Sequence, residues 1–392
     1  MVKTIKDKFY GDYSTGDGAD KVTIIGSSLI TVNTKKGNDS VLMSSGFCMN
    51  DTIKLGDGAD ILTVNKKAMV YDTVVRAGNG NDKVTVNGTQ QGVKVYGDAG
   101  ADVINITGEV RTKSGANSYV SSFGSGYTID GGSGKDRITI NGGTGFKIAG
   151  GTDNDVINVY GGSKHNVNGG SGNDVITAKD LKSLSNGGNN VFDGGVGNDT
   201  ITVWNNSSTV KGGNGSDKIY IKGGSLHSVK GDAGNDTIVV NGGTNVKIYS
   251  GTGTDRITIT SGSKHTVSLG SGKNTVKFGN ASGILGTIGT LTMGRNSVDN
   301  ITIQWGKGTH YGKYVLKTAN SVSQKSVYND TLTISGIKSS VFDFRYKNST
   351  LTMSYGAGSI VIDNFLSNGF RKGITFSDKT LSRSAILKKA GK

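Results

Sequence analysis

Aspartate returns along this chain at a nearly constant interval, each time at the end of a glycine-rich segment. The phrase is Gly-Gly-x-Gly-x-Asp, and an aliphatic residue follows two positions after the acid. The acidic position is occupied by Asp136, Asp155, Asp174, Asp199, Asp217, Asp236, Asp255 and then Asn274, at intervals of 19, 19, 25, 18, 19, 19 and 19 residues. Looser copies place Asp20, Asp39, Asp60, Asp82 and Asp102 at the same point. Carboxylates and backbone carbonyls are the oxygen ligands that hard cations prefer, so this pattern favours cation binding.

A single aspartate in a glycine turn is most often a turn residue that hydrogen-bonds its own backbone. Stacked copies are different, because successive strands would place the carboxylates in a row about 4.8 Å apart. Neighbouring charges at that distance repel by roughly 1 kcal/mol in water and 3–4 kcal/mol at an effective dielectric constant of 20. A divalent cation between loops would turn the repulsion into attraction, and oxygen-only ligation favours Ca²⁺. We therefore expect several calcium ions, mainly in one column along one edge.

The segments between the acids predict the elements that would position them. After Asp136, residues 137–140 alternate between polar and apolar as in a half-buried strand, residues 141–144 form a turn, and residues 146–148 form a second short strand. Two short strands cannot bury a core alone, but stacked copies bury one continuous apolar column. The sequence therefore predicts an all-β fold, a parallel β-roll or β-helix solenoid of ~19-residue coils with a C-terminal β cap.

Composition agrees with this fold and excludes several classes of protein. The chain of 392 residues has 64 glycines and no proline, as expected where tight turns recur and every strand donates its N–H groups. Its acids are 29 aspartates and one glutamate, Glu109, and aspartate is typical of loops. The one cysteine, Cys48, excludes a disulfide framework. No apolar run reaches the roughly 20 residues of a transmembrane helix, and the N-terminus lacks the apolar stretch of a cleaved signal peptide.

Three regions are predicted from the regularity of the repeat. Residues 1–109 contain the degenerate coils, residues 110–278 contain the regular ones with an excursion near 111–127, and residues 279–392 form the β-rich cap. A smaller excursion is expected at 179–190, where the interval is 25 residues. Strand patterns in the last region lie at 301–303, 331–334, 342–344, 351–353 and 360–362.

The loops resemble the GGxGxDxUx nonapeptides of RTX (repeats-in-toxin, haemolysin-type calcium-binding) proteins. The resemblance covers residues 12–278 and is strict from Gly131 to Gly253. It implies that calcium is bound by loop aspartates and glycine carbonyls shared between neighbouring coils. The implied metal ligands are Asp82, Asp102, Asp136, Asp155, Asp174, Asp199, Asp217, Asp236, Asp255, Gly132, Gly134, Gly151, Gly170, Gly172, Gly195, Gly197, Gly213, Gly215, Gly234 and Gly253.

The same resemblance implies type I secretion through an uncleaved C-terminal signal and calcium-driven folding outside the cell. The chain departs from the family pattern in several places. Asn274 replaces the acid, so that site is expected to be weak or empty, and Asp153 stands where other loops have glycine. Family members commonly have a nonapeptide on both edges, whereas one edge is plain here. The C-terminus is basic at Lys388, Lys389 and Lys392.

The formal net charge of +14 suggests a partner that carries negative charge, such as acidic cell-surface polysaccharide or lipopolysaccharide. The alternative is that outward lysines keep a long β surface soluble and unpaired. No aromatic–basic motif points to specific nucleic-acid recognition. The sequence does not indicate an oligomeric state.

Catalytic constellations are not evident. With one glutamate and most repeat-region aspartates assigned to loops, no carboxylate pair is available for glycoside hydrolysis, and Cys48 has no neighbouring histidine to act as a base. Three histidines, His165, His227 and His265, share one place in the plain turn, two or three coils apart, which is too far to share a zinc ion. We expect them to be surface turn residues.

The leading hypothesis is a secreted, non-enzymatic calcium-binding RTX repeat protein with a structural or adhesive role, extracellular or at the cell surface. The alternative hypothesis is a non-catalytic calcium-binding module of a polysaccharide-active enzyme or of an RTX toxin.

Overall fold

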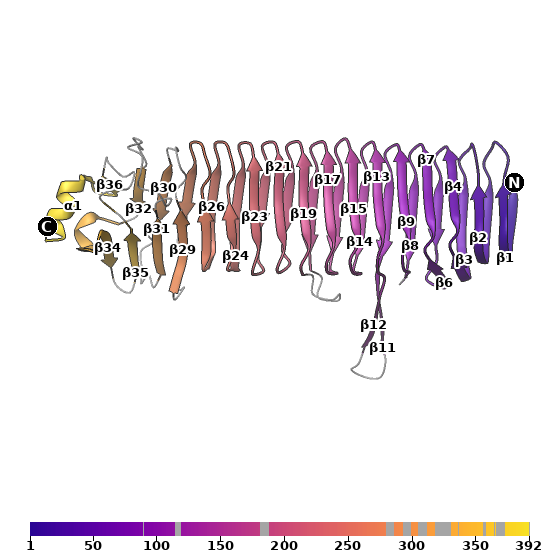
Figure 1. Cartoon of the computed structure of the whole chain (residues 1–392), viewed down its shortest axis with the longest axis horizontal. Helices are drawn as coiled ribbons and strands as arrows, with labels where there is room; N and C mark the ends of the chain where they lie inside the picture. Colours follow the sequence, from indigo (N-terminus) through magenta and orange to yellow (C-terminus); the bar gives the residue numbers. More distant parts are fainter. Residues whose placement is uncertain are drawn as a thin grey trace. The chain divides into compact units, whose positions relative to one another are not determined.

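The computed structural model describes residues 1–88, 90–113, 119–180, 188–279, 286–292, 299–304, 312–317, 331–335, 337–355, 358–363, 365 and 373–391. The chain divides into two compact units, Met1–Thr200 and Ile201–Lys392. Almost all regular structure in both units is β-strand (Figure 1).

Unit 1 is built from short strands separated by tight turns. They are β1 (Val2–Ser14), β2 (Lys21–Asn33), β3 (Ser40–Met49), β4 (Thr52–Asp57), β5 (Ile61–Val64), β6 (Ala68–Tyr71), β7 (Val74–Asn79), β8 (Lys83–Asn87), β9 (Lys94–Ala99), β10 (Val103–Thr107), β11 (Glu109–Lys113), β12 (Tyr119–Phe123), β13 (Thr128–Ser133), β14 (Arg137–Asn141), β15 (Lys147–Thr152), β16 (Val156–Tyr160), β17 (Asn166–Ser171), β18 (Val175–Lys179) and β19 (Val191–Val196).

The strands of unit 1 pair in parallel with the equivalent strand one coil further along. One series runs β8–β10–β14–β16–β18 and the other β7–β9–β13–β15–β17–β19. The register in these pairs is unshifted, so Ile138 lies beside Ile157 and Ile148 beside Val167. Each coil therefore contributes one strand to each of two parallel sheets, and equivalent residues form straight rows.

Alternation along each strand directs one row of aliphatic side chains into the space between the sheets. Ile104, Ile138, Ile157 and Ile176 form such a row, and all are completely buried. The polar residues between them face outward. A single coil could not exclude water from these side chains, so the narrow core exists only because coils stack.

The predicted excursion near 111–127 is a β-hairpin. β11 and β12 pair in antiparallel fashion, and the hairpin extends away from the coils of unit 1 (Figure 1). The predicted excursion at 179–190 falls largely on residues 181–187, which lie outside the described residues.

Unit 2 continues the same pattern of short strands. They are β20 (Thr200–Val203, which begins on the last residue of unit 1), β21 (Thr209–Asn214), β22 (Lys218–Ile221), β23 (Ser228–Ala233), β24 (Thr237–Thr244), β25 (Lys247–Tyr249), β26 (Arg256–Ser263), β27 (His265–Ser268), β28 (Thr275–Phe278), β29 (Gly286–Thr292), β30 (Asn300–Gln304), β31 (Gly312–Lys317), β32 (Thr331–Ser335), β33 (Asp343–Lys347), β34 (Thr350–Tyr355), β35 (Gly358–Ile362), β36 (Ile374–Phe376) and β37 (Thr380–Leu381), with the 3-10 turn η1 (Ser339–Val341) and helix α1 (Arg383–Lys389).

Parallel stacking in unit 2 extends beyond the last glycine-aspartate loop. One series runs β22–β24–β26–β28–β30–β32–β36, and the other ends β27–β29–β31–β35. Strands are present at all five predicted positions after residue 278. The apolar row that includes Ile257 and Val276 continues through Ile301 and Leu332 to Ile374, so the coils persist where the sequence period is lost.

The end of unit 2 closes with antiparallel strands and a short helix. β34 pairs with both β33 and β35, and Phe342, Phe344 and Phe376 cluster with ring centroids 5.7–6.4 Å apart. Helix α1 begins after Ser382, whose hydroxyl accepts a hydrogen bond from the backbone N–H of Ala385. The predicted all-β parallel solenoid is confirmed, whereas the three-region division stays a prediction.

Candidate metal centre

The repeated aspartates of unit 1 form a continuous hydrogen-bond ladder. The backbone N–H of each donates to Oδ1 of the aspartate one coil further along, with N–O distances of 2.7–2.8 Å. The ladder consists of Asp20, Asp39, Asp60, Asp82, Asp102, Asp136, Asp155, Asp174 and Asp199, all at most 4% exposed. The sequence equivalence therefore corresponds to a real row of buried carboxylates, degenerate copies included.

Unit 2 contains a second ladder of the same kind. Asp217 donates from its backbone to Asp236 at 2.9 Å, Asp236 to Asp255 at 3.1 Å, and Asp255 to Oδ1 of Asn274 at 3.0 Å. Nδ2 of Asn274 then donates to Oδ1 of Asp299 at 3.2 Å. Asn274 thus keeps the ladder intact without a carboxylate, and Asp299 is a buried ladder member that the glycine phrase did not reveal.

Glycine allows the loops to approach one another. The eleven glycines proposed as ligands all have φ between +103° and +138°. At Gly151 a Cβ would overlap the backbone oxygen of Gly132 in the preceding coil, so no side chain fits there. Main-chain carbonyls are consequently brought against the neighbouring loop along the edge that holds the aspartates.

The second carboxylate oxygen is the unusual feature of the ladder. Among the described residues, the aspartates whose Oδ2 is buried without a hydrogen-bond partner include Asp60, Asp82, Asp102, Asp136, Asp155 and Asp174 in the first ladder and Asp236 in the second, seven in all. A buried acceptor left unpaired costs about 1–3 kcal/mol, and more when it is charged. An orphan that recurs in coil after coil indicates that another group satisfies it.

Where the loop begins with glycine, as it does before Asp102, Asp136, Asp155, Asp174 and Asp236, the orphaned oxygen lies beside a carbonyl of the next coil. A Cβ on Gly131 would meet both Oδ2 of Asp136 and the carbonyl oxygen of Gly150. The arrangement repeats at Gly150, where the atoms are Oδ2 of Asp155 and the carbonyl oxygen of Gly169. The bare Cα of the first loop glycine is what leaves room for the two oxygens to converge.

Burial also makes the carboxylates hard to ionise. Desolvation raises the pKa of Asp155 to about 7, and the neighbouring charges of Asp136 and Asp174 add to the shift. Desolvation likewise raises the pKa of Asp102 and of Asp236 to about 7. An opposite charge beside these carboxylates would lower their pKa values again.

The donor set fits a hard cation. Carboxylate and carbonyl oxygens converge from adjacent coils, and Ca²⁺ takes 6–8 such ligands. Within the described residues, no three His, Cys, Asp or Glu side chains cluster as metal ligands. Most ligands of any ion would therefore be backbone carbonyls, with one ladder aspartate as the acidic ligand.

The predicted aspartates all lie in the two ladders, but their role as ligands stays a prediction. The list of glycines omitted the first glycine of each loop, although its carbonyl is the one that faces an orphaned oxygen. The Gly-Gly doublet at the start of each loop could have identified this first glycine from the sequence. The sequence analysis also missed a ladder of asparagines in unit 1: Oδ1 of Asn154 accepts from the N–H of Asn173, and Oδ1 of Asn173 from that of Asn198, both at 2.6 Å.

The expectation for the histidines was wrong. His165, His227 and His265 are each 1% exposed and point into the plain edge. Nδ1 of His165 accepts a hydrogen bond from the backbone N–H of Phe146 at 3.2 Å, and the two rings lie 4.9 Å apart. The residue before each histidine has a positive φ, which turns the following side chain inward.

Burial of His165 predicts a loss of stability in acid. Desolvation lowers its pKa to about 4 from an ordinary value of 6.5. The unfolded chain therefore binds the proton first, and stability contributed by the neutral ring is present above pH 6.5 and lost as the pH falls towards 4. The loss is at most about 3 kcal/mol. His165→Asn keeps an acceptor, so urea unfolding between pH 7.5 and 4.5 should show a shallower decline for the variant. Parallel declines would contradict this role.

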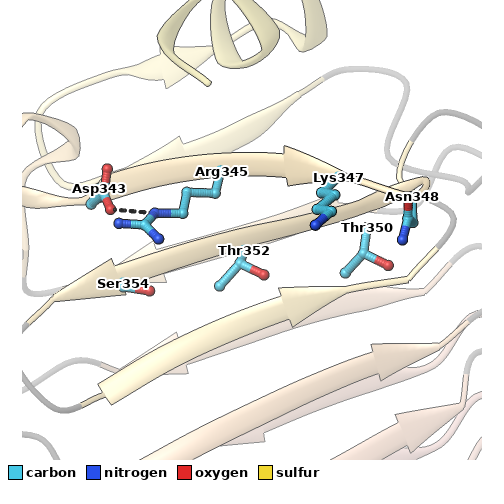
Figure 2. Close-up of a pocket in the computed structure, with 7 residues that line it drawn as sticks. All are labelled: Asp343, Arg345, Lys347, Asn348, Thr350, Thr352 and Ser354. Atoms are coloured by element: carbon cyan, nitrogen blue, oxygen red, sulfur yellow. Dashed lines mark hydrogen bonds and ion pairs between the residues drawn. The ribbon is translucent and has the colours of Figure 1, made fainter. Parts of the chain in front are cut away.

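Unit 2 has a polar hollow on the outer face of the β33–β34 hairpin (Figure 2). It has a volume of about 600 Å³ and is lined by Asp343, Arg345, Lys347, Asn348, Thr350, Thr352 and Ser354. Oδ2 of Asp343 accepts from Nε of Arg345 at 3.1 Å, and both side chains are largely exposed. Because the pair offsets its own charge in solvent, Lys347 supplies the one net positive charge of the lining.

No protein-family model and no curated protein sequence matches the chain. Among solved structures, it is similar to a hyperactive, Ca²⁺-dependent, β-helical antifreeze protein from an Antarctic bacterium. The two sequences are 16% identical, the match covers 97% of this chain and 94% of the other, and the TM-score is 0.40. A likeness at this level carries no conclusion about function. Among the described residues, no helix is both long and apolar enough to cross a membrane.

Proposed function

We propose that this chain is an extracellular calcium-binding β-solenoid of the RTX type, with a structural or adhesive role and no catalytic activity of its own. The observation that carries the proposal is the row of buried carboxylates, seven of which leave the second oxygen without a hydrogen-bond partner among the residues that the structure describes. Calcium would be held by the ladder aspartates and by carbonyls of the loop glycines in adjacent coils. When bound, it supplies the positive charge that such a row requires.

The hydrogen-bond ladder alone does not account for the choice of aspartate. Asn274 accepts the same backbone hydrogen bond without introducing a buried charge. Selection for the ladder alone would therefore favour asparagine, because an uncompensated buried carboxylate is destabilising. Aspartate at twelve of the thirteen equivalent repeat positions is explained if the carboxylates bind a cation.

Calcium would then be coupled to folding, because loops from adjacent coils come together only when the coils stack. Extracellular calcium modules have dissociation constants of about 10⁻⁴–10⁻³ M. An occupied site at 100 times its dissociation constant adds about 2.7 kcal/mol to the free energy of unfolding. Several such sites would supply as much as the whole stability of an ordinary domain, about 5–15 kcal/mol.

Chelation of calcium is therefore expected to unfold most of the solenoid. Far-ultraviolet circular dichroism and thermal melts should be recorded in 10 mM CaCl₂, in EGTA, and in EGTA with 10 mM MgCl₂. We expect the β signal and a melting temperature that rises with calcium concentration only in CaCl₂, because Mg²⁺ demands tighter octahedral geometry. An unchanged β signal and melting temperature in EGTA would refute the proposal.

Type I secretion and attachment to an anionic surface remain part of this proposal. Secretion is supported by the resemblance of the repeats, and attachment by the net charge of +14. Each occupied site would add further positive charge to the chain.

A further inference from the structure

Unit 2 has a second hollow, on the outer face of three neighbouring coils near the plain edge. It has a volume of about 420 Å³. Its lining includes Leu226, Asn245, Lys247, Tyr249, Lys264 and Thr266. These residues come from β25, β27 and the turns that precede them, together with the turn before β23.

The outward side chains of this face form a regular array of three rows. Strand pairing places Ser228, Lys247 and Thr266 side by side, and Lys230, Tyr249 and Ser268 side by side. The third row lies at the turn, where Leu226, Asn245 and Lys264 have φ of 57–60°. Backbone hydrogen bonds of 2.8–3.0 Å between successive coils hold these turns and strands in place.

Three lysines cross this array on a diagonal, one in each coil. Lys230, Lys247 and Lys264 are all exposed, and each successive one lies one coil further along and one row nearer the turn. A strand spacing of about 4.8 Å and a shift of two residues along the strand separate Lys230 from Lys247 by about 8 Å at Cα. None of the nine positions in the array is acidic, and the next acid along β23 is Asp232.

The remaining side chains supply apolar and hydrogen-bonding contacts beside the charges. Tyr249 lies on one side of the diagonal, beside Lys230 on the neighbouring strand and two residues from Lys247 on its own, with 45% of its surface exposed, and Leu226 is 61% exposed. Ser228, Asn245 and Thr266 add hydroxyl and amide groups. A ring with polar neighbours can stack on the apolar face of a sugar while the neighbours hydrogen-bond its hydroxyls.

We propose that this face binds a strand of acidic polysaccharide, whose carboxylate or sulfate groups contact the diagonal of Lys230, Lys247 and Lys264 while one sugar ring packs on Tyr249. The assignment rests on the proposed extracellular, adhesive function and specifies the surface and ligand class for it. Lysines in three successive coils match a linear polyanion better than a small anion, because evenly spaced charges contact a chain simultaneously. A single-stranded nucleic acid would instead be expected to use several aromatic platforms, and the array has one ring.

Binding can be measured by biolayer interferometry with folded protein in calcium buffer at low salt. The immobilised probes are hyaluronan for carboxylate, dextran sulfate for sulfate, neutral dextran, and oligothymidylate. We expect binding to hyaluronan, to dextran sulfate or to both, and weaker binding to the other two. The variant K230Q/K247Q/K264Q should weaken glycan binding about tenfold and reduce its salt dependence. Tyr249→Ser should weaken binding about threefold with the salt dependence unchanged.

The matched control removes the same charge from other exposed positions of unit 2, as K222Q/K277Q/K338Q, and should bind like the unaltered protein. Equal losses in both triple variants would show that net charge, not this array, attracts the glycan. Equal binding of neutral dextran, or tighter binding of oligothymidylate, would also overturn the proposal. Circular dichroism in the same calcium buffer distinguishes a loss of glycan binding from a loss of calcium-dependent folding. A protein that keeps its β signal but does not bind glycan contradicts the binding face and leaves the calcium proposal intact.

Discussion

Gly151→Val is expected to cost more than about 4 kcal/mol of unfolding free energy, the largest effect of any single substitution considered for this protein. Gly151 has φ of +120°, a conformation that a β-branched residue rarely adopts. A Cβ there would overlap the oxygen, carbonyl carbon and nitrogen of Gly132. These are backbone atoms inside a ladder, so they cannot move aside without separating two coils.

Gly145→Ala, compared with Gly151→Ala, is the matched control for this site. Gly145 also has a positive φ, +70°, but a Cβ there has no other atom within 4 Å. Its cost should be limited to the strain of a left-handed residue, about 1–2 kcal/mol. Urea unfolding in saturating calcium measures both variants. Equal losses of unfolding free energy would mean that glycine is required at these positions by backbone strain rather than by contact between coils.

Asp155→Asn is expected to reduce the calcium dependence of stability while preserving the ladder. Asparagine retains the oxygen that accepts the Asp136 N–H at 2.8 Å, as Asn274 does for Asp255. It loses the carboxylate, whose pKa burial raises to about 7. The slope of unfolding free energy against the logarithm of calcium concentration reports the number of ions bound on folding, and we expect this slope to fall for the variant.

Asp155→Ala provides the contrast. It should lower the slope by the same amount and, in addition, destabilise the protein at every calcium concentration by about 1–3 kcal/mol, because the Asp136 N–H is left buried without an acceptor. Chemical unfolding across 0.5–20 mM calcium distinguishes the two effects. A slope for Asp155→Asn equal to that of the unaltered protein would remove Asp155 from the set of ligands.

Local periodicity was sufficient to predict the solenoid and its acidic row. The interval between aspartates equals one coil, and the alternation in segments such as 137–140 identifies which residues enter the core. Both signals depend on short stretches of chain, and stacking repeats them without change. Asp20, Asp39 and Asp60 therefore join the ladder although their loops are degenerate.

The same reasoning failed at the turns. Alternation along a strand does not predict which way a side chain points at a turn whose backbone is left-handed. Lys164 has φ of +57°, and the side chain of the next residue, His165, points into the core instead of into solvent. Reasoning from periodicity also failed beyond residue 278. Asp299 continues the ladder 25 residues after Asn274, but no Gly-Gly-x-Gly-x-Asp segment precedes it. In both cases the outcome depends on contacts with the adjacent coil.

The amino-acid order by itself determined the all-β solenoid, the coil length and the row of aspartates, because these follow from spacing and alternation within one repeat. Only the tertiary structure decided that the second oxygen of Asp136 or Asp155 is buried without a partner, which glycine carbonyl faces it, and that three lysines align across neighbouring coils of unit 2. The physical reason is that these relations join atoms of different coils, about 19 residues apart in the chain but one strand spacing apart in space.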